Sequence, residues 1–309
     1  MKTGIFLSYK GIGANLLHLS YCHQIAKKFG PVTIITLSSK LAEILESDPN
    51  VKEVVYLDKY HKNISDIFSL SKFFKKFKFN NIFIFYPSVR FYIACKISGI
   101  KNIYQYPLFK KQNLHLVKTA KKFTEKTLKI ENCPTETNFL LDEEKLQKYR
   151  IPNKKIIIFG IGSSGPTTKW GYKNYLALIE KFEKLNSSFY YFLLCGPDES
   201  NAADEMIKKL NIPNCKSLAN ENISEIIYYI SSSNLYIGND SFGHHIASQR
   251  KISSFIIMLD TPAAYTSYSK FQNRITPHNV SIDEITHDTR LDANLISVDD
   301  VFNSLKQFI

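Results

Sequence analysis

The sequence predicts an α/β protein made of two doubly wound, Rossmann-like domains that face each other across a cleft. The 309 residues are too many for one ordinary core and suit two domains of average size. Short β-rich runs alternate with segments whose apolar residues recur at helical spacing, as in a parallel sheet covered by helices on both faces. The alternation pauses and restarts near residue 150. The predicted domains are therefore residues 1–150 and 151–309.

The first domain is expected to contain five strands. Apolar residues at helical spacing follow the first of them, for example Leu16, Tyr21 and Ile25. Residues 110–150 are polar and rich in lysine, and we expect them to form helix and loop. The strands are predicted at Ile5–Ser8, Val32–Leu37, Glu53–Leu57, Ile82–Tyr86 and Asn102–Tyr104.

The second domain is expected to begin with an apolar run at Lys155. Its predicted strands are Lys155–Gly160, Phe189–Cys195, Leu235–Ile237 and Ser253–Leu259. Its predicted helices are Asn174–Leu185, Ala202–Leu210, Ile223–Ser231 and one that runs through Ile246. Ligands of doubly wound sheets lie at the carboxyl ends of strands, so the loops after these strands are where function is expected.

The composition is that of a globular protein, with 44% hydrophobic and 22% charged residues. No run reaches the roughly 18–20 apolar residues needed to cross a bilayer. The first apolar run ends before Lys10 and is too short for a secretory signal, so we expect a cytoplasmic protein. The five cysteines are scattered and form no C-x-x-C pair, which argues against a disulfide framework or a zinc site and favours buried free thiols.

The net charge of +12 favours anionic partners. Residues 71–78 combine four lysines with three phenylalanines, and the seven lysines from Lys110 to Lys129 are opposed by Glu125 alone. Two interpretations stay open: a solvated helix face, or peripheral contact with the anionic lipids of the inner membrane. Nucleic-acid binding would depend on charge alone, because no aromatic–basic recognition motif is present, and we do not expect it.

The first candidate loop, residues 10–15, lies between the first strand and the first helix. Gly11 and Gly13 would let the backbone turn tightly and approach a ligand at the helix N-terminus. The G-x-G-x-x-G fingerprint of dinucleotide binding fails, because Leu16 stands where a third glycine is needed. An ordinary strand–helix turn is the alternative to a ligand loop.

The second candidate loop, residues 160–170, follows the strand that opens the second domain. Its three glycines, four hydroxyl side chains and Lys169 suit a loop that wraps phosphate oxygens, with the lysine as a point charge. It is not a Walker A loop, because Trp170 follows the lysine where Ser or Thr is required. A flexible polar loop is the alternative.

The third candidate loop lies within residues 236–247. A strand ends at Gly238, and Asp240 or Ser241 can cap the next helix, whose N-terminus offers N–H groups to an anion. With an imidazole, these groups would form a cradle for a diphosphate. The adjacent His244 and His245 could instead suggest a metal. Neighbouring residues do not share a helix face, and no cysteine or carboxylate cluster accompanies them, so no metal is expected.

Together these segments resemble glycosyltransferase family 9, the ADP-heptose:lipopolysaccharide heptosyltransferases and their relatives, over nearly the whole chain. Four motifs carry the resemblance, and they occur in the family's order. They are the opening Gly-Ile-Gly-x-x-Leu-Leu (11–17), the "GS…K-x-W…F" segment (162–175), a strand end like "GGPxE" (195–199) and a helix start like "DSGxxHxAA" (240–247).

The resemblance implies a GT-B fold and inverting, metal-independent sugar transfer without a cofactor. The donor would be a nucleotide-sugar, with an ADP-sugar expected, and the acceptor a lipopolysaccharide, another envelope saccharide or a lipid-linked saccharide. The first domain would then bind the acceptor and the second the donor. Residues implied to bind the donor diphosphate are Ser163, Ser164, Thr167, Thr168, Lys169, Asp240, Ser241, Gly243, His244 and His245; Pro197, Asp198 and Glu199 would lie near the nucleoside, and Gly11 and Gly13 would form the acceptor-side loop.

The chain departs from the family at the catalytic base. The family carries an aspartate in the N-terminal loop, and alignment on Gly13 or on His18 places Ala14 or Asn15 there. Neither side chain accepts a proton, and a general base contributes roughly 10²–10⁴-fold to the rate. His18 is the nearest titratable side chain and would suit the task. A partly buried helix residue is the alternative for His18.

A second departure lies in the donor site, where Phe242 replaces the glycine that follows Asp-Ser in the family. The glycine falls at Gly243 instead, so the shape of the sugar pocket changes and ADP-heptose itself is not carried over. Two functions follow. The chain is either a transferase of hexosyl or heptosyl groups, or a catalytically impaired GT-B-like protein that binds nucleotide or glycan without turnover.

Overall fold

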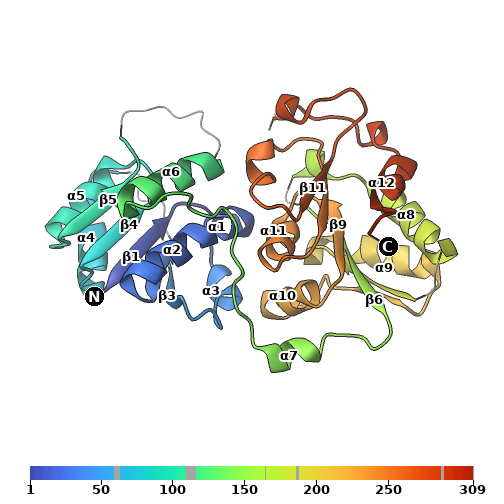
Figure 1. Ribbon diagram of the computed structural model, residues 1–309, viewed down its shortest axis with the longest axis horizontal. Coiled ribbons are helices and arrows are strands. Elements are labelled where there is room, and N and C mark those ends of the chain that lie inside the picture. Colours follow the sequence, from blue (N-terminus) through green and yellow to red (C-terminus); the bar gives the residue numbers. More distant parts are fainter. Residues whose placement is uncertain (59–62, 109–115, 164, 186–187, 287–288, 309) are drawn as a thin grey trace. The chain divides into compact units, whose positions relative to one another are not determined.

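The computed structural model describes residues 1–58, 63–108, 116–163, 165–185, 188–286 and 289–308. The chain divides into two compact units, Met1–Leu140 and Leu141–Ile309 (Figure 1). The short helix α7 (Glu143–Gln147) belongs to the second unit, where Lys145 Nζ lies 2.9 Å from Glu225 Oε1. The sequence pattern placed the division near residue 150 because the strand–helix alternation resumes only at Lys155.

The first unit is a five-stranded parallel sheet in the order β3-β2-β1-β4-β5. The central strands β1 and β2 are buried along their whole length, as expected of near-continuous apolar runs in a parallel sheet. The elements are β1 (Thr3–Leu7), α1 (Ile12–Leu16), α2 (Leu19–Phe29), β2 (Val32–Thr36), α3 (Leu41–Ile44), β3 (Val51–Tyr56), α4 (Asp66–Phe77), β4 (Asn81–Ile84), α5 (Val89–Ile97), β5 (Asn102–Gln105) and α6 (Leu116–Leu128).

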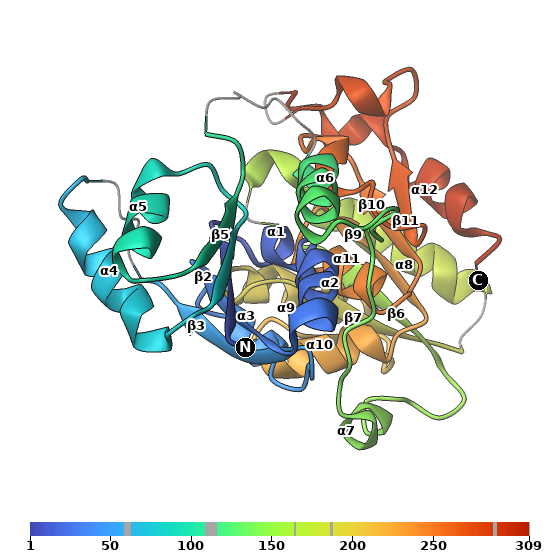
Figure 2. The same ribbon diagram turned by 60° about the vertical axis from the view of Figure 1, so that its left-hand side comes forward.

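Helices cover both faces of this sheet (Figure 2). On one face α4 and α5 pack over an apolar core in which the rings of Phe6 and Phe91 stack at 4.2 Å. On the other face α2 and α6 meet, and the Tyr21 hydroxyl donates to the carbonyl of Val117 at 3.1 Å. Both helices are amphipathic, so each buries an apolar stripe against the sheet and turns its lysines to solvent.

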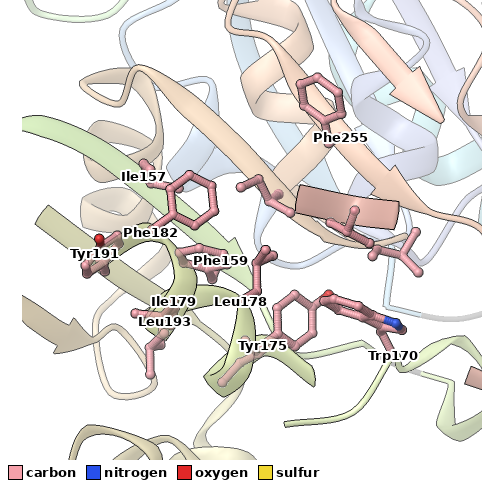
Figure 3. Close-up of a cluster of buried hydrophobic side chains, with 14 of the residues drawn as sticks. Ile157, Phe159, Trp170, Tyr175, Leu178, Ile179, Phe182, Tyr191, Leu193 and Phe255 are labelled. Carbon is pink, nitrogen blue, oxygen red and sulfur yellow. The ribbon is translucent and has the colours of Figure 1, made fainter. Parts of the chain in front are cut away.

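The second unit is a six-stranded parallel sheet in the order β11-β10-β9-β6-β7-β8. Its core gathers aromatic side chains from β6, α8 and β7, including Phe159, Phe182 and Tyr191 (Figure 3). The elements are β6 (Lys155–Gly160), η1 (Pro166–Thr168), α8 (Tyr172–Leu185), β7 (Phe189–Leu194), η2 (Pro197–Glu199), α9 (Ser200–Leu210), β8 (Cys215–Ser217), α10 (Ile223–Ser231), β9 (Leu235–Asn239), α11 (Phe242–Gln249), β10 (Ser254–Ile257), η3 (Ala263–Tyr265), β11 (Gln272–Ile275), η4 (Ile282–Glu284), η5 (Ala293–Leu295) and α12 (Val298–Leu305).

The nine predicted strands are confirmed, with ends that shift by a few residues. The edge strands β8 and β11 were not predicted, because Cys215–Ser217 and Gln272–Ile275 are short and carry few apolar residues. The expected burial of all five cysteines is also confirmed. No helix in the described part of the chain is both long enough and apolar enough to span a membrane.

Candidate functional site

Three loops of the second unit follow the carboxyl ends of the neighbouring strands β9, β6 and β7, where ligands of such sheets bind. They begin at Asp240, Ile161 and Cys195 respectively. Side-chain hydrogen bonds tie the three loops together. The structure therefore brings the second and third candidate loops of the sequence to one edge of one sheet, together with the loop that carries Glu199.

Lys169 and Glu199 form the charged centre of this region. Lys169 Nζ lies 2.5 Å from Glu199 Oε1, and the Lys169 and Glu199 side chains are 31% and 13% exposed. The pKa of Lys169 is raised, chiefly by its hydrogen bond to Glu199, so the amine remains charged. Glu199 Oε2 accepts the backbone N–H of Gly196 at 3.1 Å, and the Tyr172 hydroxyl lies 3.4 Å from Oε1. Pro197 and Asp198, which lie between Gly196 and Glu199 in the sequence, are exposed.

Gly162 is required by the close approach of the loops after β6 and β7. A Cβ atom at this position would lie 2.3 Å from Glu199 Oε2 and 2.9 Å from the Cα of Cys195. The absence of a side chain therefore lets the Glu199 carboxylate reach across to Lys169. The glycine of the "GS" motif is thus explained by packing against the predicted nucleoside-side loop.

Asn239 at the end of β9 fixes the loop that carries Lys169. Its side chain is fully buried, and its Oδ1 accepts the backbone N–H of Trp170 and the Tyr175 hydroxyl, both at 2.9 Å. Its Nδ2 donates to the carbonyl of Ile161 at 2.8 Å. The sequence placed Asn239 in the motif without a role. The three bonds make it the residue that positions both ends of the loop from residue 161 to residue 170.

The hydroxyl residues of the 160–170 loop are bonded within the site. Ser163 Oγ lies 2.5 Å from Thr168 Oγ1 and donates to the carbonyl of Asp240 at 3.2 Å. Thr167 donates to Asp260, the residue that also accepts the backbone N–H of Arg290. The expectation for Ser164 concerns a residue outside those that the structure describes.

The N-terminus of α11 lies beside the 160–170 loop, because the Ser163 hydroxyl donates to the carbonyl of Asp240. Ser241 is the N-cap residue, but its side chain makes no capping bond and lies 3.0 Å from the Tyr236 hydroxyl instead. The first N–H groups of a helix lack partners within the helix and favour anions. Gly243 stands where a Cβ would lie 2.6 Å from the Tyr236 ring and 2.7 Å from Leu194. The glycine therefore lets the first turn pack closely on β7 and β9.

A hydrogen bond from Gln272 of β11 fixes which ring nitrogen of His244 accepts and which one donates. Gln272 Oε1 accepts the backbone N–H groups of Tyr268 and Ser269, both at 3.2 Å, which orients its amide. Its Nε2 therefore donates to His244 Nδ1, 3.2 Å away. A neutral His244 then carries its proton on Nε2 and donates to Asp240 Oδ1 at 2.5 Å. His244 thus orients the Asp240 carboxylate from a fully buried position.

His245 is buried behind the same helix turn. Its Nδ1 lies 2.9 Å from the Tyr268 hydroxyl, and its ring lies 3.9 Å from that of His244. Burial, reinforced by the neighbouring His244, lowers the pKa of His245 well below its ordinary value, so the ring is neutral. The ring nitrogens of His244 and the Nδ1 atom of His245 are therefore engaged in hydrogen bonds inside the unit, and both residues are buried.

Asp240, His244 and His245 are also a group that could hold a metal ion. One ligand atom from each lies within 4.8 Å of the others, among the residues that the structure describes. The bonds of His244 compete with such a role, because its Nδ1 accepts from Gln272 and its Nε2 donates to Asp240. Metal binding would require His244 to lose the proton contact with Asp240.

In the first unit, Ala14 and Asn15, the two residues that align with the family aspartate, lie in α1, directly after the loop that follows β1. Gly11 is exposed and Gly13 half-buried, whereas Asn15 is 2% exposed. Asn15 Nδ2 donates to the carbonyls of Tyr9 (3.0 Å) and Gly11 (2.7 Å). Its Oδ1 accepts the Thr36 hydroxyl at 2.7 Å. All of its polar groups are engaged, so Asn15 braces this loop against β2.

His18 is fully buried among aromatic rings. Its Nδ1 lies 2.7 Å from the carbonyl of Ala14 and donates to it, while Nε2 has no partner among the described residues. The ring stacks on Tyr9 at 4.8 Å and meets the edge of Phe85 at 5.4 Å. Burial lowers the pKa of His18 to about 4, so the ring is neutral and only weakly basic.

A cavity of about 340 Å³ opens at the carboxyl ends of β1, β2 and β3 in the first unit. It is lined by Lys10, Lys40, Tyr56 and Asp58, with Ser38 and Ser39 beside them. Asp58 is the one carboxylate among its described lining residues. The sequence did not single out Asp58, because it follows β3 without any surrounding motif.

Comparison with known proteins supports the resemblance. The model of glycosyltransferase family 9 (heptosyltransferase) matches residues 101–251. Structures similar to this chain include E. coli ADP-heptose lps heptosyltransferase II (TM-score 0.75, 15% identity, covering 100% of this chain and 98% of that one). The family 9 glycosyl transferase of Veillonella parvula (0.77, 15%, 99% and 97%) and E. coli heptosyltransferase WaaC with ADP (0.73, 11%, 100% and 100%) are also similar.

More distant is the dodecameric, iron-containing glycosyltransferase TibC of enterotoxigenic E. coli (TM-score 0.55, 12% identity, covering 99% of this chain and 75% of that one). No curated protein sequence matches the chain. The similar structures show that the chain has the GT-B fold, and the family model marks residues 101–251 as similar to glycosyltransferases. Within that class it is similar to family 9, the heptosyltransferases, and the resemblance expected from its motifs is confirmed.

Proposed function

We propose that this chain transfers a heptose-like sugar from a nucleoside-diphosphate donor to a saccharide of the cell envelope, with inversion and without a divalent cation. An ADP-sugar is the proposed donor, since similar structures carry ADP or are ADP-heptose enzymes. The observation that supports donor binding is the Lys169–Glu199 pair, which sets a cation and a carboxylate beside the N-terminus of α11. We also propose that the protein acts in the cytoplasm, in peripheral contact with the inner membrane.

In the proposed reaction, an acceptor hydroxyl attacks the anomeric carbon while the bond from that carbon to the diphosphate oxygen breaks. The leaving diphosphate keeps the electron pair of that bond. Lys169 and the N–H groups at the start of α11 would stabilise its growing charge. Glu199 would accept hydroxyls of the nucleoside when the diphosphate takes over its contact with Lys169. His244 would hold the Asp240 carboxylate in place for the polar groups of the donor.

The hydroxyl proton must pass to a base, and Asn15 cannot take it. We propose Asp58 for this role, because it lines the cavity at the carboxyl ends of β1 to β3 on the proposed acceptor side. Asp58→Asn should lower kcat by roughly 10²-fold or more with little change in the affinity for ADP. A kcat of Asp58→Asn equal to that of the wild type would reject this assignment.

A thermal-shift screen of nucleoside diphosphates tests the donor site. ADP is expected to raise the melting temperature equally in Mg²⁺ and in EDTA. Stabilisation that disappears in EDTA would contradict metal independence and would direct attention to Asp240, His244 and His245. The proposal of a nucleotide-sugar donor fails if no nucleoside diphosphate stabilises the protein.

A second candidate function is binding of nucleotide or glycan without turnover. It is favoured by Asn15, whose polar groups are all engaged, and by the burial of His18. Incubation with ADP-heptose and a de-acylated lipopolysaccharide acceptor separates the two candidates. Binding of the nucleotide with neither transfer nor release of ADP would favour the second candidate.

A further inference from the structure

A pocket of about 500 Å³ lies between the edge strand β5 and the helix α6 of the first unit. The sheet order ends at β5, so the outer side of this strand is not covered by another described strand. On the strand side the pocket is lined by residues 103–107. On the helix side it is lined by Thr119, Lys122, Phe123, Lys126 and Thr127, whose spacing places them on one face of α6.

The interior of this pocket is mainly apolar. Tyr104 and Phe123 contribute to its surface, and the Phe123 ring meets the ring of Tyr106 at 5.0 Å. Tyr104 stacks on Phe83 of the neighbouring strand at 4.7 Å, which fixes that wall. A volume of this size is within the range of small-molecule sites. The walls therefore suit an apolar chain rather than a saccharide, which needs many hydrogen-bonding partners.

Among the described residues that line the pocket, all the charged ones are lysines. Lys122, Lys126 and Lys129 are exposed, and none forms an ion pair with a described residue. Glu125, the single acid of α6, is bonded to Lys121 and also accepts the backbone N–H of Cys133 at 3.0 Å. Glu125 is thus paired with Lys121 and also interacts with the charge of Lys122. One acid faces three lysines, so the rim of the pocket keeps a net positive charge.

Gln105 adds a polar group at the end of the strand wall. Both its Nε2 and its Oε1 are buried and have no hydrogen-bond partner among the described residues. A buried amide without partners is unfavourable, and such a group calls for a ligand or solvent atom beside it. Because both atoms are buried, a ligand in the pocket can reach this donor and acceptor only when the Gln105 side chain turns toward it.

We propose that this pocket binds the acyl chain and phosphate of an anionic lipid, with the chain between β5 and α6 and the phosphate on the three lysines. Apolar walls under a cationic rim complement an amphiphile that carries a negative head. This assigns the lysine-rich stretch of α6 to lipid recognition rather than to a solvated helix face. That the lipid carries the saccharide acceptor rests on the proposed function, whereas the binding itself does not.

Dodecyl phosphate is a suitable probe, used below its micellar concentration with the full-length protein. Binding is measured by calorimetry, with inorganic phosphate and dodecyl glucoside as single-feature controls. Dodecyl phosphate should bind roughly tenfold or more tightly than either control, because each control lacks the chain or the charge. Equal binding of inorganic phosphate would show an adventitious anion site, and equal binding of dodecyl glucoside would show an apolar pocket without head-group recognition. Either outcome overturns the proposal.

Two triple variants separate the pocket from the general charge of the protein. Replacing Lys122, Lys126 and Lys129 with Gln should weaken dodecyl phosphate at least about tenfold. Replacing the exposed lysines of α4, Lys72, Lys75 and Lys76, with Gln removes the same charge and should leave binding unchanged. If both variants lose equal affinity, binding follows net charge and the proposal fails.

Gln105→Leu provides a variant that is expected to fold. Removing the buried amide should raise the melting temperature of the protein alone, while weakening dodecyl phosphate several-fold. Unchanged affinity for dodecyl phosphate would remove Gln105 from the site. ADP binding in the second unit, measured in parallel, reports on the donor site. If dodecyl phosphate does not bind but ADP does, the lipid proposal is wrong and the proposed transferase function is unaffected.

Discussion

Lys169 Nζ lies 2.5 Å from Glu199 Oε1, and this ion pair joins the loop after β6 to the loop after β7. The two residues come from different motifs, thirty positions apart in the chain. Their contact depends on Gly162, which leaves room for the carboxylate, and on Asn239, which holds the backbone of Trp170. The charged centre of the proposed donor site is therefore held in place by contacts within the chain.

Removal of the lysine should weaken the donor diphosphate selectively. Lys169→Ala is expected to reduce ADP affinity by roughly tenfold or more, because a charge-assisted contact is removed and Glu199 is left unpaired. The affinity for adenosine, which lacks phosphates, should fall much less in the same variant. Lys173→Ala removes an exposed lysine four residues away and is the matched control. Equal loss of ADP affinity in both variants would show that Lys169 acts only through net charge.

The close contact at Gly162 predicts a pair of glycine variants with opposite outcomes. In Gly162→Ala the new Cβ would overlap Glu199 Oε2 and the backbone of Cys195, so we expect a loss of roughly 1–3 kcal/mol in stability and weaker ADP binding. In Gly196→Ala the nearest atom to the new Cβ is 3.9 Å away, so both properties should be preserved. Denaturant unfolding and ADP calorimetry measure the two effects. A fully tolerated Gly162→Ala would contradict the close approach of the two loops.

The hydrogen bonds from Gln272 to His244 and from His244 to Asp240 predict which ring nitrogen of His244 carries the proton. Nitrogen NMR of the histidine rings should find His244 protonated on Nε2 and not on Nδ1. In Gln272→Glu the new carboxylate can still accept from Tyr268 and Ser269 but has no proton to donate, so Nδ1 should take one up. Gln272→Leu, which offers neither, should give a mixture of tautomers. A wild-type His244 ring that carries its proton on Nδ1 would contradict this series of hydrogen bonds.

Asn15 supplies a test of whether the family aspartate can be restored. In Asn15→Asp the carboxylate would face the carbonyl oxygens of Tyr9 and Gly11 in place of a donor, with a cost of roughly 2–5 kcal/mol. We expect lower stability and no gain in transfer rate. A variant that transfers sugar faster than the wild type would show that this position can still hold the catalytic base.

His18 predicts a pH-dependent stability in the acid range. Its folded pKa of about 4 lies below the unfolded value of 6.5, so the unfolded chain takes up the proton first as the pH falls. The contribution of neutral His18 to the free energy of unfolding is fully present above pH 6.5. It is lost as the pH falls toward 4, and the total loss is roughly 3 kcal/mol. His18→Phe keeps the ring between Tyr9 and Phe85 and should remove this part of the pH dependence.

Urea unfolding of wild type and His18→Phe at several pH values between 4 and 7 checks this prediction. The same slope in His18→Phe and in the wild type would mean that His18 is not the residue responsible.

The order of strands and helices could be predicted because apolar runs and helical spacing are local properties. The glycines and the lysine of the 160–170 loop were likewise visible in the sequence. The role of Asn15 was not, because it depends on Thr36, which is distant in the chain and reaches Asn15 only through the pairing of β1 with β2. Gln272 was missed for the same reason, since the polar strand β11 contacts α11 only in the folded sheet.

The burial of the five cysteines makes this chain convenient for site-specific labelling. Burial raises the pKa of Cys133 and Cys195 to about 11 and that of Cys215 to about 12, so these thiols stay protonated and unreactive at neutral pH. A cysteine introduced at an exposed position would therefore react first with a maleimide dye. Pairs of such dyes, one in each unit, would measure the distance between the units in solution without removal of any native residue.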